Sequence, residues 1–400
     1  MGLLNPEIKT KIEMINRGEV PEGYKKTRIG IIPDDWEGKR LYEILTVRHG
    51  RDQKEIESKS GRYPILGTGG IIGKTDSFLY DKPSVLIGRK GTIDRPQYIE
   101  KPFWTIDTLF YTEIKENVVE KYIYYLFTTI NWYAYNEASG VPSLNAKVIE
   151  NIKVNIPNLF EQKTIVEILS TWDKAIELKE KLIEEKKKQK RGLMQRLLTR
   201  IIRLPGFEGE WEETRLKEVG EVVTGTTPST KIKEYYEGGT YPWITPTDIT
   251  ENKYISRSER YLTEAGLRAG RFLPAGSLLI TCIASLGKNA ILTVNGSCNQ
   301  QINAIITSKN YLNEFLYYLI EFHADYIKSY AGKSATEIIN KNTFENLKFK
   351  IPSLQEQKAI AQILSTADRE IELLEKELEQ LKLQKKGLMQ LLLTGIIRVK

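Results

Sequence analysis

Two long stretches of the chain place apolar residues at alternating intervals of three and four, with charged residues between them. Such spacing puts the apolar side chains on one stripe of a helix and is typical of a coiled coil. Each stretch opens on a helix-capping pattern, Asn158 with Glu161 in the first and Ser353 with Glu356 in the second. The pattern predicts two helices of about 40 residues, each a rod of ~60 Å.

Lysines interrupt the apolar stripe, at Lys179, Lys186 and Lys190 in the first helix and at Lys385 in the second. If the helices pair, the second must run back along the first, because the chain reaches it only after leaving the first helix at its far end. This predicts an antiparallel pair with a globular unit at each end and the C-terminus near the N-terminal unit. Two independent surface helices are the alternative. The residues expected to pair the helices are Ile165, Leu169, Trp172, Ile176, Ile183, Leu193, Leu197, Ile360, Leu364, Ile371, Leu374, Leu378, Leu381 and Leu388.

The two helical stretches are copies of one another. Asn145 begins NAKVIENIKVNIPNLFEQ and Asn340 begins NKNTFENLKFKIPSLQEQ, and the same offset continues into KRGLMQRLLT and KKGLMQLLLT without a gap. The preceding stretches correspond more loosely, for example YPIL at Tyr63 with YPWI at Tyr241. A repeat of this kind indicates two units on one scaffold whose polar loops differ.

Outside the helices, short apolar runs alternate with turn residues, which predicts two mixed α/β (α+β) domains related by an approximate two-fold axis. SVLIGRKGTI at Ser84 is expected to be a strand entering a basic turn, and FWTIDTLFYTEI at Phe103 to be one half-buried strand. The expected divisions are an N-terminal segment near the distal helix, 1–29; a first domain, 30–156; a central helix, 157–203; a second domain, 204–351; and a distal helix, 352–400.

The composition narrows the class of protein. Of 400 residues, 59 are Lys or Arg and 52 are Asp or Glu, a net charge of +7 that suits a polyanionic partner through local basic patches. Cys282 and Cys298 lack metal-ligand spacing and are expected to be buried thiols. A disulfide between them is the alternative. His49 and His323 are too few for a His-rich metal site. Without a signal peptide or a ~20-residue apolar run, the chain is expected to be cytoplasmic.

The stretch GTGGIIGKT at Gly67 looks like a phosphate-binding loop, but its spacing does not fit. Such a loop needs a glycine, four residues, and then Gly-Lys-Ser/Thr; counting back from Gly73, the required glycine falls on Thr68. The flanks also lack the expected strand before the loop and helix after it. The glycines are expected in a surface loop, either a plain one or one whose backbone approaches a ligand closely.

Other catalytic signatures are missing from the sequence. It contains no Asp/Asn-Pro-Pro-Tyr/Phe tetrapeptide for amino methylation and no GxGxxG after a strand. Asp107 with Glu113 and Lys115 faintly imitates the acidic pair and lysine of a nuclease, but the spacing is short and the segment is expected to be one strand. No residue is therefore assigned to catalysis or to a metal.

Loops of both predicted domains combine hydroxyl, amide and basic side chains, which suit hydrogen bonds to DNA phosphates and base edges. The run EEKKKQKR at Glu184 is expected to be a solvated helix face, with a contact to DNA phosphates or to a protein partner as the alternative. The candidate DNA contacts are Arg51, Gly67, Thr68, Gly69, Lys74, Arg89, Lys90, Thr92, Ser143, Asn145, Ser229, Thr230, Lys231, Tyr235, Trp243, Thr245, Thr247, Asp248, Ser285, Lys288, Asn299, Gln300, Gln301, Lys333 and Ser334.

The segments IPNLFEQKTIVEILSTWDKAI and IPSLQEQKAIAQILSTADREI, with KRGLMQRLLT and KKGLMQLLLT, resemble the specificity (S) subunit of type I restriction–modification systems over almost the whole chain. GTTPSTKIKEYYEGGTYPWITPTDI looks like the opening of that family's recognition domains, whereas VRHGRDQKEIESKSGRYPIL in the first domain lacks its Thr-Pro-Ser. The resemblance implies a non-catalytic subunit with two target recognition domains, each reading one half of a split, asymmetric site in double-stranded DNA.

The resemblance also implies partners. Two methyltransferase (M) subunits docked on the helices would flip and methylate an adenine in each half-site with S-adenosylmethionine. Restriction (R) subunits would cleave, and ATP and Mg would belong to these partners, so no cofactor is expected in this chain. The helical rod would set the gap between half-sites, on the order of one ~34 Å turn of DNA. One helical turn of ~4 residues inserted in a rod would then alter that gap.

Three other interpretations stay open. The chain could be an enzyme in its own right, a P-loop ATPase or a nuclease, and ATP hydrolysis by the isolated chain would support this. It could be a coiled-coil scaffold with no DNA role, which absent DNA binding in the presence of partners would support. It could also be the specificity subunit of a related system that cuts beside its site, because that difference lies in the partners.

Overall fold

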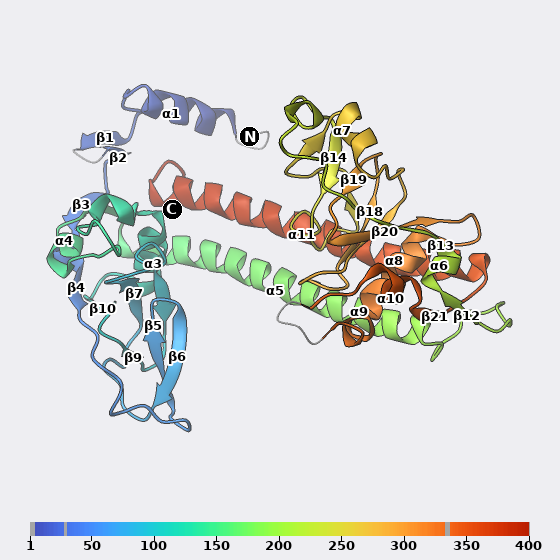
Figure 1. The fold of residues 1–400 in the computed structure, drawn as a ribbon. Helices are drawn as coiled ribbons and strands as arrows, with labels where there is room; N and C mark the ends of the chain where they lie inside the picture. Colours follow the sequence, from blue (N-terminus) through green and yellow to red (C-terminus); the bar gives the residue numbers. More distant parts are fainter. Residues whose placement is uncertain (1–4, 28–29, 333–336, 400) are drawn as a thin grey trace. The chain divides into compact units, whose positions relative to one another are not determined.

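The computed structural model describes residues 5–27, 30–332 and 337–399 (Figure 1). It divides into two compact units, Met1–Glu180 with Glu377–Lys400, and Lys181–Lys376. Helix α5 (Leu159–Leu198) begins in the first unit and ends in the second, whereas α11 (Leu354–Leu393) begins in the second and ends in the first. The C-terminal segment therefore belongs to the N-terminal unit, as the connectivity predicts.

The first unit contains short strands, short helices and parts of both long helices. Its elements before α5 are α1 (Pro6–Asn16), β1 (Tyr24–Thr27), β2 (Gly30–Pro33), β3 (Glu37–Arg40), α2 (Leu41–Ile44), β4 (Leu45–Arg48), β5 (Tyr63–Gly67), β6 (Gly70–Thr75), β7 (Ser84–Gly88), β8 (Gln97–Ile99), β9 (Trp104–Thr105), β10 (Leu109–Ile114), α3 (Glu120–Thr129), the 3-10 helix η1 (Trp132–Tyr135), α4 (Ala146–Glu150) and β11 (Lys153–Ile156).

The second unit has a related order of elements, with additional short ones such as η2 and α7. Those between α5 and α11 are β12 (Glu212–Arg215), α6 (Leu216–Val219), β13 (Gly220–Thr224), η2 (Lys233–Tyr235), β14 (Tyr241–Ile244), β15 (Tyr254–Ile255), β16 (Tyr261–Leu262), α7 (Glu264–Ala269), β17 (Leu278–Thr281), β18 (Asn289–Leu292), β19 (Ser297–Cys298), β20 (Ile302–Thr307), α8 (Asn313–Phe322), α9 (Ala324–Ser329), α10 (Lys341–Glu345) and β21 (Lys348–Ile351).

Both units are mixed α/β and repeat one topology. The larger sheet has the order β4-β10-β7-β8 in the first unit and β13-β20-β17-β18-β15 in the second. The smaller sheets are β6-β5-β9 and β16-β14-β19, in which the central strand pairs in parallel with the last. β3 in the first unit and β12 in the second pair antiparallel with β11 and β21, the last strands before the long helices. The predicted fold class is confirmed, whereas the five segment boundaries stay a prediction.

The long helices are part of each unit's hydrophobic core. In the first unit, Leu169 of α5 and Leu392 of α11 are packed among the buried side chains of β7 and α3. In the second, Leu364 of α11 and Leu197 of α5 take the corresponding places beside β17 and α8. Every residue of β7 and β17 is buried, so both faces of these strands lie in apolar surroundings. Each unit is thereby fixed to both helices by burial of apolar surface.

Within each unit the two helices run antiparallel. In the first unit Asp173 pairs with Lys385, and Lys179 pairs with Glu377 at 2.8 Å. In the second, Lys187 pairs with Glu375 at 2.7 Å, and Lys190, further along α5, pairs with the earlier Asp368. Partners on α11 thus come earlier in sequence as α5 proceeds. The prediction of an antiparallel pair is confirmed.

The lysines that interrupt the apolar stripe all have acidic partners on the opposite helix. Lys186 lies 2.6 Å from Glu370, and Lys179, Lys190 and Lys385 meet the acids named above. Most of the predicted pairing residues are buried or half-buried, but Leu193 is 37% exposed while its neighbour Met194 is buried. Leu193 therefore lies at the margin of the stripe, because Met194 and Leu197 occupy the buried face of the helix end.

The basic run at Glu184 is partly exposed and partly paired with acids of the opposite helix. Lys186, Lys187 and Lys190 pair with acids of α11. Lys188 and Arg191 pair with Glu185 and Glu184 of the run itself. The expectation of a solvated face holds for Glu184, Glu185, Lys188 and Arg191, which are exposed. Lys186, Lys187 and Lys190 are instead half-buried against α11.

The sequence at Phe103 does not form one strand, so that expectation is wrong. β9 ends at Thr105 and β10 begins at Leu109, with Asp107 in the turn between them. The GKT of GTGGIIGKT lies in strand β6 instead of opening a helix, and Gly67 and Gly70 are paired across the β5–β6 hairpin. A phosphate-binding loop is thus excluded by local geometry, because that loop must lead into a helix N-terminus.

Candidate nucleic-acid interface

In the first unit, several turns meet around the segment Thr105–Thr108 that separates β9 from β10. The Ile106 amide donates to the carbonyl of Leu66 at 3.1 Å, which fixes the Gly67 hairpin beside this segment. The Arg51 amide donates to the Thr105 carbonyl at 2.8 Å, and the Arg89 amide to the Thr108 carbonyl at 2.8 Å. Three loops far apart in sequence are therefore joined through one backbone segment.

A fifth segment completes this cluster of turns. Lys90 forms an isolated β-bridge with Ser143, and the Gly91 amide donates to the Pro142 carbonyl at 2.9 Å. The Leu144 amide donates to the Arg89 carbonyl at 2.8 Å. We call the cluster of residues 49–51, 67–70, 89–92, 105–108 and 142–144 the first turn cluster.

The second unit builds the same cluster with different side chains. The Asn299 amide donates to the carbonyl of Ile244 at 2.9 Å, and the Cys282 amide donates to that of Gln301 at 2.8 Å. The Thr226 amide donates to the Cys298 carbonyl at 2.9 Å, and the Ala284 amide donates to the Glu337 carbonyl at 3.0 Å. We call the cluster of residues 225–227, 245–248, 282–285, 298–301 and 337–339 the second turn cluster.

A glycine makes the close approach possible in each cluster. A Cβ added at Gly50 would lie 2.0 Å from the carbonyl oxygen of Ile106, and one added at Gly225 would lie 2.2 Å from that of Asn299. No side chain fits at those distances. These two glycines mark equivalent positions, although neither stands out in the sequence.

The loop Thr245–Asp248 is held rigid by its own side chains. Asp248 accepts hydrogen bonds from the Thr245 amide at 2.8 Å and, through its other oxygen, from the Glu259 amide at 2.8 Å. The Thr245 hydroxyl lies 2.8 Å from that of Thr247. A pre-ordered loop of this kind loses little conformational entropy when it binds a ligand.

Aromatic side chains pack against the second turn cluster. Trp243 is buried, and its indole N–H donates to the Thr226 carbonyl at 2.9 Å. The Arg260 guanidinium lies 4.9 Å from the ring centre of Tyr236 and 5.0 Å from that of Trp243. Burial raises the pKa of Tyr236, and its hydroxyl donates to the Pro228 carbonyl. Trp243 therefore has a structural role, and Arg260, which was not predicted, presents its charge beside the cluster.

The predicted DNA contacts differ in how far a ligand could reach them. Gly67, Trp243 and Asn299 are buried and act as support. The half-buried residues are Thr68, Arg89, Thr92, Ser143, Tyr235, Thr245, Asp248, Ser285 and Gln301. The exposed residues are Arg51, Gly69, Lys74, Lys90, Asn145, Ser229, Thr230, Lys231, Thr247, Lys288 and Gln300. Lys333 and Ser334 lie outside the described residues.

Not all candidates belong to the turn clusters. Lys74 lies along β6, away from the hairpin turn, and the Asn145 side chain caps α4 by accepting from the Lys147 amide. Ser229–Lys231 lie on the loop that leads into η2, and Tyr235 is the last residue of η2. Sequence analysis missed the turn Asp107–Thr108, whose only signal was a break in hydrophobic alternation.

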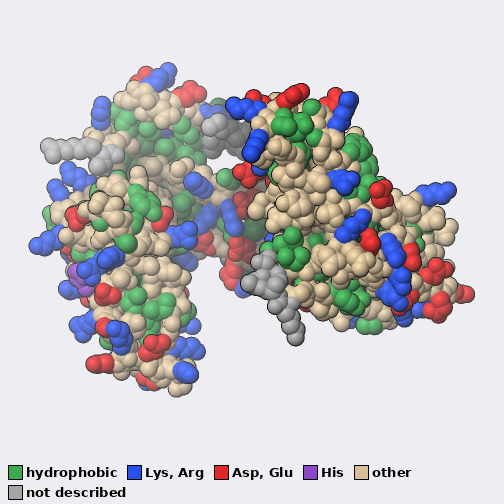
Figure 2. Space-filling view, in the orientation of Figure 1, with side chains coloured by type: hydrophobic (Ala, Val, Ile, Leu, Met, Phe, Trp, Pro, Cys, Tyr) green, Lys and Arg blue, Asp and Glu red, His purple; other side chains and the backbone are tan. Residues whose placement is uncertain are grey.

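The charge around the first turn cluster is mixed. Figure 2 shows basic and acidic side chains interspersed over the surface of this unit. The Arg89 guanidinium lies 3.9 Å from Asp107, and that of Arg48 lies 2.9 Å from Glu113, an interaction that raises the pKa of Arg48. Arg51 and Lys90 project as exposed cations. This mixture of basic and acidic side chains favours contacts to particular bases over general attraction to the phosphates.

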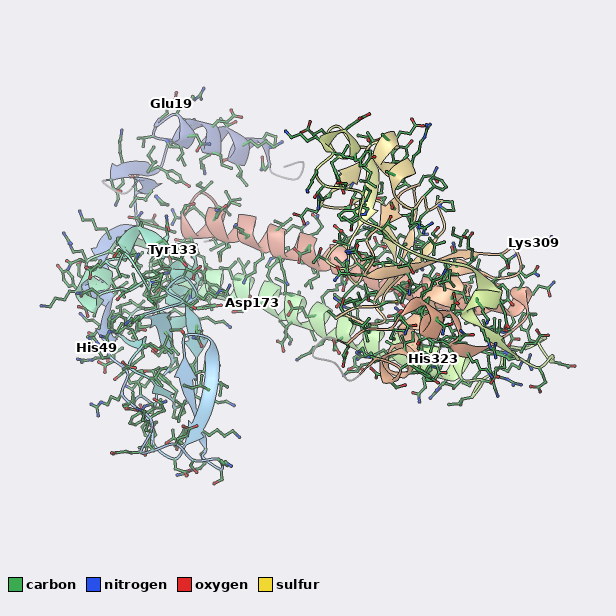
Figure 3. All side chains as sticks on the ribbon, in the orientation of Figure 1. Glu19, His49, Tyr133, Asp173, Lys309 and His323 are labelled. Atoms are coloured by element: carbon green, nitrogen blue, oxygen red, sulfur yellow. The ribbon has the colours of Figure 1, made fainter. Side chains whose placement is uncertain are left out.

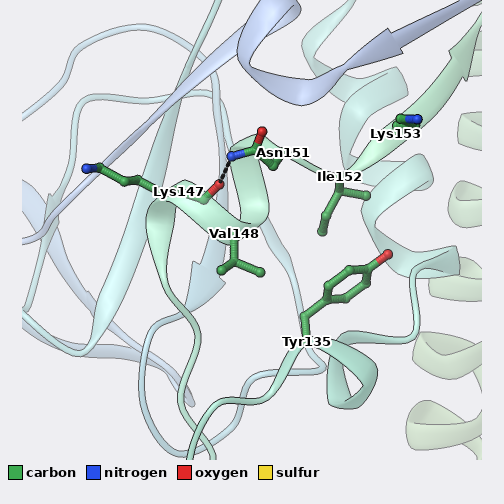
Figure 4. A pocket seen from close by; sticks show the side chains of 6 residues that line it. All are labelled: Tyr135, Lys147, Val148, Asn151, Ile152 and Lys153. Atoms are coloured by element: carbon green, nitrogen blue, oxygen red, sulfur yellow. Dashed lines mark hydrogen bonds between the residues drawn. The ribbon is translucent and has the colours of Figure 1, made fainter.

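One hollow of the first unit lies apart from its turn cluster. In the first unit, an open hollow of about 490 Å³ is lined by Tyr135, Lys147, Val148, Asn151, Ile152 and Lys153 (Figure 4). It lies on α4 and β11, outside the turn cluster, and contains no carboxylate. Over the described ranges, no group of three or more acidic, His or Cys side chains could hold a metal. Within the same residues, no helix is long and apolar enough to span a membrane.

The family model for the type I restriction modification DNA specificity domain matches residues 33–187 and 208–383, most of the chain. The chain belongs to this family. Each match covers one turn cluster together with most of the long helix that follows it. The specificity subunit of the MjaVIII type I restriction enzyme of Methanocaldococcus jannaschii is 27% identical to this chain. The alignment covers 95% of this chain and 97% of that subunit. The specificity subunit of the Escherichia coli type I restriction enzyme EcoR124I/EcoR124II is 33% identical over an alignment that covers 43% of this chain and 47% of that subunit.

Solved structures of this family share the fold. The S subunit of a type I restriction–modification system from M. genitalium superposes with a TM-score of 0.59 at 16% identity, covering 91% of this chain and 96% of its own. A chain from a structure that addresses complex assembly of a type I R-M system gives a TM-score of 0.62, also at 16% identity, covering 92% and 99%. The resemblance in the sequence is thus confirmed, and family membership makes this chain a non-catalytic specificity subunit that recognises DNA.

Proposed function

We propose that each turn cluster reads one half of a bipartite, asymmetric DNA site. The observation that carries this proposal is the repetition of one five-segment cluster, built by the same backbone contacts on different side chains, within a single specificity subunit. Different polar groups on a common frame would select different bases, since base identity is read by the donor and acceptor pattern that a side chain presents.

The two clusters offer different chemistry at equivalent positions. The Leu66 and Ile244 carbonyls accept equivalent hydrogen bonds, so Gly67–Gly70 corresponds to Thr245–Asp248. The first loop is mostly backbone and suits close approach to phosphates, whereas the second presents ordered hydroxyls. At the positions equivalent to Asp107 and Thr108 the second cluster has Gln300 and Gln301, whose amides can donate and accept. Two unrelated half-sites are therefore expected.

The helices are proposed to dock two methyltransferase subunits and to set the gap between the half-sites. Leu178 and Leu373, which occupy equivalent positions in the two copies of the repeat, are both more than half exposed on the long helices. One exposed leucine at the same repeat position of each long helix supports two docking sites of the same kind. S-adenosylmethionine would act in the methyltransferases, and ATP and Mg in the restriction subunits, so this chain would hold no cofactor. Its place of action would be the cytoplasm.

A specificity subunit of a related system that cuts beside its site is the second candidate, and its partners would distinguish it. A map of methylated adenines in the host genome, with and without this chain, tests the proposal. We expect a split motif with a fixed gap that disappears on deletion and returns on complementation. An unchanged map, together with failure of the purified chain to bind the methyltransferase, would refute the proposal.

A further inference from the structure

One aspartate in the first unit joins three helices. Asp173 of α5, labelled in Figure 3, accepts a hydrogen bond at 2.5 Å from the hydroxyl of Tyr125 on α3 and pairs with Lys385 of α11. The Lys385 ammonium also lies 5.4 Å from the ring centre of Tyr125. Ser170 lies 3.2 Å from the same hydroxyl. We call this group the first helix junction.

The second unit repeats the junction with its own residues. Asp368 of α11 accepts from the hydroxyl of Tyr318 on α8 and lies 2.7 Å from Lys190 of α5. Lys190 is 5.5 Å from the Tyr318 ring centre, and Ser365 is 3.2 Å from its hydroxyl. Asp368 is the repeat equivalent of Asp173, and Lys385 is that of Lys190. The second helix junction is therefore a copy of the first.

The second junction carries an additional lysine, Lys253. Its ammonium lies 2.8 Å from the Tyr318 hydroxyl, 3.0 Å from that of Ser365 and 3.5 Å from Asp368, and its side chain is only 10% exposed. Burial lowers the pKa of Lys253, with Asp368 opposing the shift. A cation held this deeply fixes the backbone that carries it, because withdrawing the cation would break its hydrogen bonds to Tyr318, Ser365 and Asp368.

An additional acid accompanies the additional lysine. Glu321, three residues after Tyr318 on α8, lies 3.6 Å from Lys190, and burial raises its pKa. The equivalent residue of the first unit, three after Tyr125 on α3, is Thr128. The second junction therefore differs from the first by one matched pair, Lys253 and Glu321, which keeps its charge balanced.

Lys253 comes from the segment that follows the loop Thr245–Asp248 of the second turn cluster. It lies five residues after Asp248 and directly before β15, the strand that extends the larger sheet of this unit. Its carbonyl accepts from the Ile291 amide at 2.7 Å, which anchors it to β18. Asp248, Thr250 and Asn252 line a hollow of about 260 Å³ in this segment. The link between the loop and the helix junction is thus short and anchored at both ends.

We propose that Lys253 is a positioning residue that ties the second turn cluster to the paired helices, so that the second half-site is read through this link and the first half-site is read without one. This inference rests on the proposed function. Over the described residues, the first junction has no side chain in the place of Lys253. The subunit is therefore asymmetric in how its two reading surfaces are held.

The double variant Lys253→Met/Glu321→Thr tests the link, since it gives the second junction the composition of the first. The full chain, assembled with its methyltransferase subunits, is titrated with duplexes that carry one mismatched base pair in either half-site. A mismatch typically weakens specific binding by about tenfold or more. We expect the variant to reduce this penalty to about two- or threefold at the second half-site and to leave it unchanged at the first.

Lys309→Met is the matched control, because Lys309 is exposed in the same unit, outside the junction (Figure 3). The Lys309→Met variant is expected to show the wild-type mismatch penalty at both half-sites. If the double variant does not fold, Ser365→Ala removes one acceptor of Lys253 and no charge, and a loss of about threefold confined to the second half-site is expected.

Two results would overturn the link. One is a folded variant with unchanged discrimination at the second half-site, and the other is an equal loss at both half-sites, which indicates a general structural role. If the wild type itself discriminated at neither half of any split site, the proposed function would fail independently of Lys253.

Discussion

Glu161 and Glu356 stand at the beginning of the two long helices, and both carboxylates are buried. The capping pattern predicted that they would reach back to the first residue of each helix. Asn158 does accept from the Glu161 amide at 2.9 Å, but the Glu161 carboxylate accepts from two guanidinium nitrogens of Arg398, Nε at 2.8 Å and Nη2 at 2.9 Å. Arg203 binds Glu356 in the same way. Each pair joins the start of one helix to the segment that follows the other.

We expect Glu161→Ala to lower the free energy of unfolding by about 2–3 kcal/mol, because it leaves the buried indole N–H of Trp36 without an acceptor and leaves Arg398 paired with Asp35 alone. Urea unfolding followed by tryptophan fluorescence measures this. The control is Glu167→Ala, at an exposed position of the same helix, with an expected change within about 0.5 kcal/mol. Equal effects of the two variants would contradict the assigned role of the pair.

The two cysteines are buried and free, as expected from their spacing. Burial raises the pKa of Cys282 to about 11 and that of Cys298 to about 12, from 9.0. A thiol with a raised folded-state pKa stabilises the fold below its unfolded pKa, and this contribution is lost as the pH rises toward the folded value.

Above about pH 9, the wild type is therefore expected to lose stability relative to the variant Cys282→Ala/Cys298→Ala, by at most about 1.4 kcal/mol per pH unit for each thiol. Unfolding curves recorded from pH 7 to pH 10.5 with a reductant provide the comparison. Parallel pH profiles of the two proteins would show that the thiols do not ionise on unfolding.

At the scale of elements, some of the cross-helix ion pairs among the described residues follow the repeat of the two helices, and others do not. Asp173–Lys385 matches Asp368–Lys190, and Glu180–Lys382 matches Glu375–Lys187. Two unmatched pairs are Lys179–Glu377 and Lys186–Glu370, and α11 has Leu374 and Leu381 where α5 has these lysines. The unmatched pairs therefore distinguish α5 from α11 and favour their pairing over that of two copies of one helix.

We expect Glu370→Lys/Glu377→Lys to lower the free energy of unfolding by about 1–2 kcal/mol, because it places like charges across the helices. Adding Lys179→Glu/Lys186→Glu should restore most of the loss. Thermal unfolding at low and at 0.5 M salt measures both, with a smaller difference at high salt. Glu185→Lys, at an exposed pair within α5, is the control. A quadruple variant no more stable than the double one would argue against these pairs.

At the scale of the whole molecule, the proposed gap depends on the length of the helices. The apolar stripe repeats every seven residues, so seven residues inserted after position 181 and again after position 376 should preserve helix pairing. The insertion lengthens each helix by ~10 Å and is expected to widen the gap in the methylated motif by about three base pairs.

Adenine methylation mapped in cells that carry the lengthened chain measures the gap. The control is an insertion in the exposed loop at 206–209, which should leave the gap unchanged. A lengthened chain that methylates sites with the original gap would reject the helices as the spacer.

The sequence by itself determined the features that depend on periodicity and repetition. The spacing of apolar residues predicted both helices, since one stripe must be buried whatever the partner is. The constant offset between the two copies predicted two like units, and chain connectivity predicted the antiparallel direction. The family resemblance rested on the same repeated segments. These signals are local or repeated without a gap, so they can be recognised without knowing which residues meet.

Only the tertiary structure decided what the polar residues bind. The stripe lysines were visible as interruptions, but their acidic partners lie on the opposite helix, far away in the sequence. The turn clusters form because sheet hydrogen bonds bring Arg89 to Thr108 and Lys90 to Ser143, and sequence spacing carries no record of such pairings. Lys253 looked like one more loop lysine, and burial against Tyr318 and Asp368 gave it a role. A polar side chain's function depends on its neighbours in space, and the fold alone sets those neighbours.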